Sequence, residues 1–251
     1  MSDVFLFLVG IVVGAMNSIA GGGLLIGYPA MLVVGIPPLV ANATSHIVVI
    51  PGQIGAIYGY RNYLRNISKL YLLLLIPCVI GAAFGALLLT KTPANEFEKL
   101  VPALLLTAVA FFAIQPMLHF HFHRHLRSKI KRILPLVIIF LTILPIAVYG
   151  GYFGVGLGFV MLAFIGFTKI HDIHRINVLK NIATLCIGIT STIILSKTGL
   201  INWGQGLSMA VGCGLGGFFG AHLAQKFSSH VIRIAVIVIG LASITILALN
   251  T

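Results

Sequence analysis

The sequence predicts an all-α integral membrane protein built from two inverted repeats of about five helical segments each. Three observations predict this class: the composition, the recurrence of long apolar runs, and a similarity between the two halves. Of the 251 residues, 59% are hydrophobic and 8% are charged, whereas a soluble domain carries about 25% charged residues. The mean hydropathy is +1.11. This composition excludes a soluble enzyme and is typical of a multi-pass membrane protein.

Apolar runs bounded by charge, glycine or proline divide the chain into two sets of candidate segments. The first set is residues 4–20, 24–35, 39–60, 70–90 and 98–118, and the second is residues 133–149, 157–168, 173–196, 203–224 and 231–249. Because these runs do not alternate with polar residues, they predict helices rather than barrel strands. The second member of each set would reach only about 18 Å across a hydrocarbon core of about 30 Å. We therefore expect about eight to ten membrane segments.

The two halves also match residue by residue, which indicates an internal duplication. Residues 80–86 align with residues 215–221 at an offset of 135, and both stretches share the same glycine spacing. Residues 21–24 (Gly-Gly-Gly-Leu) align with residues 154–157 (Gly-Val-Gly-Leu) at an offset of 133. We expect a first membrane repeat at 4–118, a basic, histidine-rich linker at 119–132, and a second membrane repeat at 133–250.

The basic residues predict the orientation in the membrane. The chain has 16 Lys and Arg against 4 Asp and Glu, an excess that cytoplasmic loops explain without nucleic acid. If each half crosses the membrane an odd number of times, the loops on one side carry twelve basic residues and the loops on the other side carry three. If each half crosses an even number of times, the division is nine against six. The odd number obeys the positive-inside rule better. It places both termini outside and the linker in the cytoplasm, and it allows either full crossings or hairpins for the short segments.

Each half contains a glycine-rich break, at Gly21, Gly22 and Gly23 in the first and at Gly154 and Gly156 in the second. Such sequences disfavour continuous helix, and irregular backbone at membrane depth is tolerated only within protein or beside a water-filled cavity. A half-helix that begins at a break would direct free N–H groups and a partial positive charge inward, which favours an anion. Close packing of helices by small residues is the alternative. We assign that alternative to the glycines at 81 and 85 and at 212, 216 and 220.

The third segment of each half is unusually polar. Thr44, Ser45 and His46 interrupt one, and Lys180 and Asn181 interrupt the other. A buried charge such as that of Lys180 costs several kcal/mol unless it is paired or hydrated. Two interpretations stay open for Lys180: it balances a bound anion, or it snorkels to the cytoplasmic surface. Two also stay open for His46, which either titrates as a coupling group or is a hydrogen-bonded structural histidine.

All four acidic residues lie outside the predicted membrane core. They are Asp3, Glu96, Glu98 and Asp172. A cation relay or an acidic selectivity ring therefore has no carboxylates from which to be built, and the remaining polar groups are suited to an anion. The predicted substrate-binding residues are Asn17, Gly21, Gly22, Gly23, Thr44, Ser45, His46, Gly154, Gly156, Lys180 and Asn181.

Catalytic, metal and cofactor sites are not supported by the sequence. Cys78, Cys186 and Cys213 lie in apolar runs without the spacing of a zinc site. The alternating histidines at 119–125 have no carboxylate or cysteine nearby, and the chain has no HExxH or GxSxG motif. We expect a transporter and not an enzyme, with no metal and no cofactor.

Several motifs, in this order, resemble the TauE/SafE family of sulfite and sulfonate exporters over nearly the whole chain. The motifs are Asn17 with Gly21-Gly22-Gly23, then Ala41-Asn42-Ala43-Thr44-Ser45, Leu179-Lys180-Asn181, Gly199-Leu200-Ile201-Asn202-Trp203 and Gly216-Gly217 with Gly220-Ala221. The resemblance implies a secondary transporter of the inner or plasma membrane that moves sulfite, sulfoacetate or another small sulfur-containing anion. The second break is less purely glycine, and the histidine-rich linker is not a feature of the family, so both leave the substrate open.

Within this class we expect a small anion to be moved by alternating access between the two repeats. An anion channel or a transporter of an unrelated small solute is the alternative. The expected partners are the anionic substrate and the lipid bilayer. A coupling ion, either a proton or sodium, and the oligomeric state stay open at this point.

Overall fold

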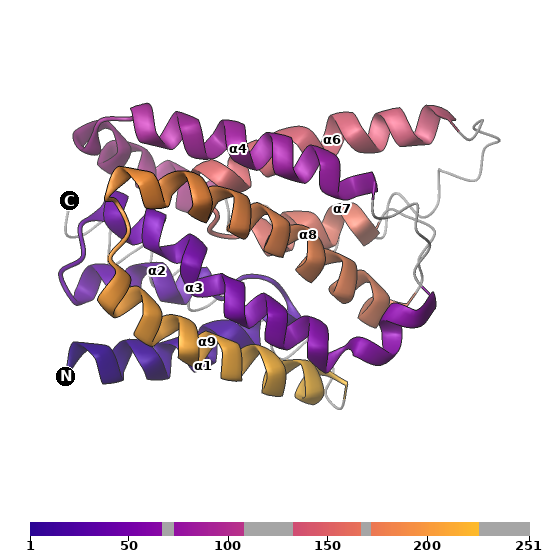
Figure 1. Cartoon of the computed structure of the whole chain (residues 1–251), viewed down its shortest axis with the longest axis horizontal. Coiled ribbons are helices and arrows are strands. Elements are labelled where there is room, and N and C mark those ends of the chain that lie inside the picture. The colour runs from indigo at the N-terminus through magenta and orange to yellow at the C-terminus, as the bar shows by residue number, and fades with distance from the viewer. Residues whose placement is uncertain (67–72, 108–132, 167–171, 226–251) are drawn as a thin grey trace.

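The computed structural model describes residues 1–66, 73–107, 133–166 and 172–225, which form a bundle of helices (Figure 1). The elements are α1 (Ser2–Ile19), α2 (Leu24–Val33), α3 (Pro38–Gly59), η1 (Arg61–Asn66), α4 (Leu75–Lys91), a helix over residues 94–107, α6 (Ile133–Tyr152), α7 (Leu157–Gly166), α8 (Ile173–Leu195), η3 (Ser196–Thr198) and α9 (Trp203–Ala224). Four of them, α1, α3, α8 with η3, and α9, are long and apolar enough to cross a membrane. The prediction of an all-helical, multi-pass membrane protein is confirmed. The linker at 119–132 and the segment at 231–249 lie outside the described residues.

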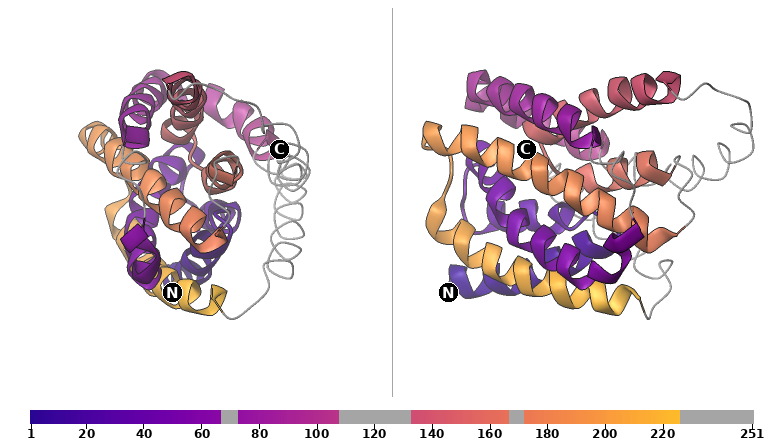
Figure 2. Two further views of the ribbon diagram at one scale, coloured as in Figure 1. Left: turned by 90° about the vertical axis from the view of Figure 1, so that its right-hand side faces the viewer. Right: turned by 45° about the vertical axis from the view of Figure 1, so that its right-hand side comes forward.

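The bundle has an η1 end and an η3 end, each named after the short helix that lies there. The η3 end holds the starts of α1, α3 and α9, since Ser208 Oγ donates to Asp3 O at 2.7 Å and the Asn202 N–H donates to Thr44 Oγ1 at 3.0 Å. The η1 end holds the ends of α3 and α9 and the start of α8 (Figure 1). Helix α1 begins at the η3 end, and α2 returns to the same end because it leads directly into the start of α3. The α6–α7 pair starts and finishes at the η1 end (Figure 2).

Glycines hold the outer helices in close pairs. Gly212 and Gly216 of α9 lie against the carbonyls of Phe7 and Ile11 of α1, where a β-carbon would collide with the backbone. Gly85 of α4 lies in the same way against the carbonyl of Val148 of α6. The packing interpretation of these glycines is confirmed. The pairing is also reciprocal, because the first helix of each predicted repeat packs against the fourth helix of the other.

Helices α3 and α8 lie between the α1–α9 pair and the α4–α6 pair (Figures 1 and 2). Their inward faces carry most of the buried polar side chains. These are Asn42, Thr44, Ser45, His46 and Gln53 on α3, and Asn177, Lys180, Asn181, Thr184 and Ser191 on α8. The outer helices expose apolar side chains instead, such as Phe84 of α4 and Phe219 of α9. A polar interior with an apolar exterior is what a lipid solvent requires.

Candidate functional site

The two glycine breaks end their helices with the same geometry. Gly21 follows α1 with φ 98° and donates its N–H to Met16 O at 3.1 Å. Gly154 follows α6 with φ 73° and donates its N–H to Tyr149 O at 3.4 Å. Both bonds run from a residue to the fifth one before it, and the positive φ of the donor residue explains why glycine is needed. Each residue of one break lies 133 positions from its counterpart, the offset found in the sequence.

The breaks meet each other in the middle of the protein. A β-carbon built on Gly21 would collide with the backbone of Gly158, and one on Gly158 would collide with the backbone of Gly21. A β-carbon on Gly154 would lie 3.1 Å from the ring carbon Cε1 of His46 in α3. The predicted site residues of the two halves are therefore neighbours, and no bulky side chain separates them.

A small cavity lies where the breaks approach α3 and α8. It is lined by Asn17, Gly21, Leu24, His46, Val49, Gln53, Gly150, Gly154, Leu157, Gly158, Thr184, Ile187 and Gly188. Its volume is about 20 Å³, which is room for about one water molecule. A substrate larger than water would fit only after the elements around the cavity move apart.

Lys180 is completely buried next to this cavity. Its side chain is 0% exposed and its Nζ donates to the backbone oxygen of Asn17 at 2.6 Å. In the described ranges the only ion pair joins Arg175 to Asp172, so no carboxylate there balances Lys180. The side chain does not reach the surface. Its partner carbonyl belongs to the last turn of α1, where the helix dipole provides a partial negative charge.

Asn17 also contacts the start of α2. Its side-chain Oδ1 accepts the N–H of Gly23 at 2.9 Å. The sequence predicts free N–H groups at this half-helix, and the structure differs in that the Gly23 N–H is already paired. The reason is local: Asn17 lies in the last turn of α1, and the chain reverses at Gly21, which brings the start of α2 back onto the asparagine side chain.

The two polar helices make matching contacts with the opposite halves. Lys180 of α8 donates to the carbonyl end of α1, and Asn42 of α3 donates through Nδ2 to Tyr152 O at the carbonyl end of α6, at 2.8 Å. Each broken helix is therefore held at its end by a side chain from the other half. These bonds satisfy carbonyls that would otherwise lie unpaired at membrane depth.

The remaining predicted residues do not line the cavity. Thr44 faces the start of α9 through its bond to Asn202, and Ser45 Oγ donates to its own helix at Asn42 O at 2.7 Å. Gly22 lies against the Phe159 ring, and Gly23 lies against the backbone of Val13. Gly156 has φ 77° and precedes α7, and Asn181 is 0% exposed with both amide atoms unpartnered among the described residues.

Gln53 and Thr184 line the cavity although they are not among the predicted site residues. Gln53 lies seven positions after His46, and Thr184 lies four positions after Lys180. Residues at these separations share one face of a helix. The spacing could have identified both side chains, since it continues the polar face of α3 and of α8 by one or two turns.

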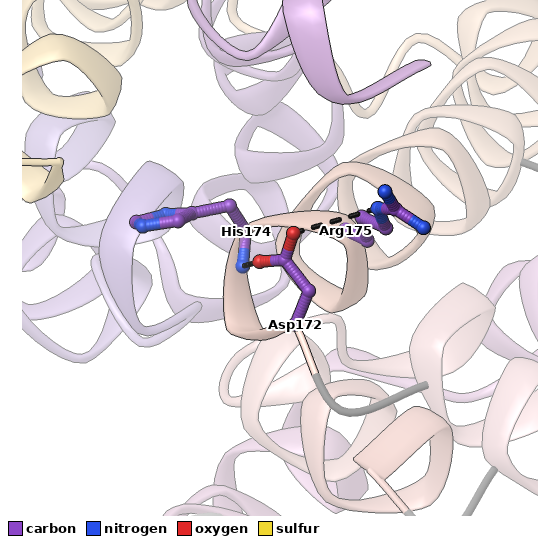
Figure 3. A network of polar contacts seen from close by, with 3 residues as sticks. All are labelled: Asp172, His174 and Arg175. Carbon is purple, nitrogen blue, oxygen red and sulfur yellow. Dashed lines mark hydrogen bonds and ion pairs between the residues drawn. The ribbon is translucent and has the colours of Figure 1, made fainter. Parts of the chain in front are cut away.

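The start of α8 is fixed by a small polar network (Figure 3). The Asp172 carboxylate accepts the His174 N–H at 2.9 Å and lies 3.4 Å from Arg175 Nε. This is a helix N-cap, which sets where α8 begins.

Comparisons with known proteins find a family and relatives that match the chain over nearly its whole length. The family described as sulfite exporter TauE/SafE matches residues 6–247. The chain is 31% identical to the probable membrane transporter protein ORF9 of a Sinorhizobium species over 245 residues, covering 95% of the chain and 89% of the relative. It is 29% identical over 239 residues to a probable membrane transporter protein of Haemophilus influenzae, covering 93% of the chain and 89% of the relative. The probable membrane transporter protein YfcA of Escherichia coli K12 is likewise 29% identical over 239 residues, with 93% and 85% covered.

No solved structure matches the chain. The family match, the relatives and the apolar helical bundle all describe a multi-pass membrane transporter. The chain therefore belongs to the TauE/SafE family of membrane transporters.

Proposed function

We propose that this protein is a secondary transporter of the inner or plasma membrane that moves a small sulfur-containing oxyanion, sulfite or an organosulfonate. The observation that carries the proposal is Lys180, a fully buried basic side chain whose hydrogen-bond partner is a neutral carbonyl. An isolated ammonium in a low-dielectric interior costs several kcal/mol. A bound anion would remove that cost, because it supplies the opposite charge that the surrounding described residues do not.

The donors around Lys180 favour an oxyanion. An ammonium has three donors, and Asn17 uses one of them. His46 and Gln53 add neutral polar side chains from α3, whereas the Thr184 hydroxyl already donates to Lys180 O at 2.8 Å. Several donors around one positive charge can bind the oxygens of a small oxyanion from different directions. The choice of a sulfur oxyanion rests on the name of the family, sulfite exporter TauE/SafE.

We further propose that the halves at 4–118 and 133–250 are inverted repeats that rock against each other. The reciprocal pairing of α1 with α9 and of α4 with α6 supports this arrangement, as do the matching helix ends at Gly21 and Gly154. The two broken pairs also enter from opposite ends of the bundle (Figure 2). Rocking would separate Gly21 from Gly158 and widen the cavity, which is the movement that alternating access needs.

The charges at the two ends support an orientation with the η1 end in the cytoplasm. Among the described residues, Arg61, Arg65 and Arg175 lie at the η1 end, and Lys91, Lys99 and Lys197 lie toward the η3 end, so these residues alone are balanced. The linker at 119–132 supplies the difference, because it carries five Lys and Arg residues and leads directly into the start of α6 at the η1 end. By the positive-inside rule, the η1 end and the linker face the cytoplasm.

A transporter is favoured over an anion channel by the size of the cavity. A channel needs a continuous polar path, whereas this cavity has a volume of about 20 Å³ and is bounded by touching backbones. We propose no catalytic role, since the polar groups at the breaks include no nucleophile beside a base.

Purified protein reconstituted in liposomes with radiolabelled sulfite tests the function. We expect sulfite flux that unlabelled sulfite blocks and that chloride, phosphate and taurine affect less. Lys180→Met should remove most of the flux, because the anion charge would be unpaired, and Lys180→Arg should retain part of it. Lys197→Met, a matched change of an exposed lysine in η3, should leave flux unchanged.

Unchanged sulfite flux in the Lys180→Met variant would refute the proposed role of the buried charge. Absence of sulfite flux in the wild-type protein would refute the substrate. Imposed proton and sodium gradients in the same liposomes identify the coupling ion, since only the coupled gradient drives uphill sulfite movement.

A further inference from the structure

We propose that Asn17 is an internal stand-in for the transported anion, and that the anion binds by displacing it. The inference rests on the proposed function and assigns a role to one residue of the same site. In this role Asn17 does not hold the anion. Its two oxygens instead compete with the anion for the donors that would bind it.

Asn17 accepts two hydrogen bonds from groups suited to an anion. Its backbone oxygen accepts Lys180 Nζ at 2.6 Å, and its side-chain Oδ1 accepts the Gly23 N–H at 2.9 Å. The first donor is a buried cation, and the second is a backbone N–H at the start of α2, where the helix dipole is positive. Because both oxygens belong to one residue, Asn17 occupies two donors that a small anion could use.

Unpartnered polar atoms in the same cavity indicate that a ligand belongs there. Asn17, His46 and Gln53 all line the cavity, and they are 5%, 3% and 6% exposed. His46 Nε2 and Gln53 Oε1 have no hydrogen-bond partner within the described residues. Buried polar atoms are nearly always paired, so His46 Nε2, which can carry a proton and donate it, is available to an anion that arrives beside Asn17. Gln53 Oε1 only accepts, so it would meet a donor such as the proton of a protonated oxyanion.

An exchange of partners explains how the buried donors stay satisfied throughout a transport cycle. An oxyanion makes stronger hydrogen bonds than a neutral amide or carbonyl oxygen, so it can take both donors from Asn17. When the anion leaves, Asn17 accepts them again, and neither the ammonium nor the N–H is left unpaired in the interior. Loss of the hydrogen bond from the Gly23 N–H to Asn17 also removes a contact between α2 and α1, which links anion binding to movement at the break.

The Asn17→Ala variant tests the stand-in role, because the role predicts a lower KM for sulfite and direct binding predicts a higher one. The substitution removes Oδ1 and keeps the backbone oxygen, so the Gly23 N–H loses its internal acceptor. We expect the KM for radiolabelled sulfite in liposomes to fall by about three- to tenfold. If the side chain instead binds the anion directly, the KM rises, and that result overturns the inference.

Thermal unfolding in detergent gives a second measurement that does not depend on turnover. Without sulfite, the Asn17→Ala variant should melt below the wild-type protein, because the start of α2 loses its cap. With saturating sulfite, its upward shift in Tm should exceed that of the wild type. A lower Tm with the same sulfite shift as the wild type would show a purely structural role and refute the stand-in.

Asn202→Ala is the matched control. Asn202 also caps a helix with its side chain, accepting the Gln205 N–H at 3.3 Å, but it lies at the start of α9 and does not line the cavity. This variant should lose stability and keep the wild-type sulfite shift. Asn17→Asp is the opposite test, since a carboxylate beside Lys180 should remove the sulfite shift altogether.

Failure of the stand-in and failure of the proposed function give different results. Suppose that the wild-type protein responds to sulfite in flux and in Tm, and that the Lys180→Met variant does not. A raised KM in the Asn17→Ala variant then means that only the stand-in role is wrong. If the wild-type protein does not respond to sulfite in either assay, the proposed function is wrong.

Discussion

Gly21 and Gly158 lie backbone against backbone, although they belong to different halves of the chain. This contact is the point at which the two helix breaks meet, and a side chain on either residue would separate them. Gly158 lies within α7 and its φ is not positive, so steric contact alone requires glycine there.

Gly158→Ala should therefore destabilise the protein by about 1–3 kcal/mol, the usual cost of overpacking, and should reduce sulfite flux because the closed arrangement is disfavoured. Unfolding in detergent and flux in liposomes measure the two effects. Gly204→Ala is the control, since a β-carbon there meets only Asn202 Oδ1, at 3.9 Å. Equal behaviour of the two variants would contradict the importance of the Gly21–Gly158 contact.

Gln53 provides a test of charge in the cavity. Gln53→Glu adds a carboxylate at nearly constant shape and should lower the affinity for sulfite by more than about tenfold, since like charges repel strongly in a low-dielectric site. Gln53→Met should cost less affinity and little stability, because Oε1 has no partner to lose among the described residues. The KM for sulfite measures both. An unchanged KM in the Gln53→Glu variant would exclude an anion from this cavity.

The N-cap of α8 should affect stability without affecting affinity. Asp172→Ala removes the acceptor of the His174 N–H and should cost about 0.5–2 kcal/mol. Arg175→Ala should cost less, because its ion pair with Asp172 is more than a third exposed on each side. Thermal unfolding separates the two variants. A raised KM for sulfite in the Asp172→Ala variant, with normal stability, would contradict a purely structural cap.

The orientation is testable by labelling single cysteines from each side of the membrane. Asn62→Cys in η1 should react from the cytoplasm, and Lys197→Cys in η3 should react from outside. Ser128→Cys in the linker should behave like Asn62→Cys. The native Cys78, Cys186 and Cys213 are replaced first, so that only the introduced thiol reacts. Labelling of Asn62→Cys and Lys197→Cys from the same side would refute the topology.

The class of the protein and most of its helices follow from local properties of the sequence. Apolar runs, charges and glycines are local properties, and in lipid they leave the backbone little choice but a helix. The predicted segment at 173–196, for example, became α8 at Ile173–Leu195. The breaks at Gly21 and Gly154 were also predictable, because glycine sequences disfavour helix wherever they occur.

Which polar groups contact each other depends on how the helices pack in three dimensions. Asn17 and Lys180 are 163 positions apart, and nothing in either local sequence specifies that the ammonium bonds to that carbonyl. The same holds for Thr44, which faces Asn202 instead of the cavity. Helical spacing tells which residues share a face, but the rotation of that face toward a particular neighbour follows from packing. In this protein the rotation depends on close glycine contacts between helices that are distant in the sequence.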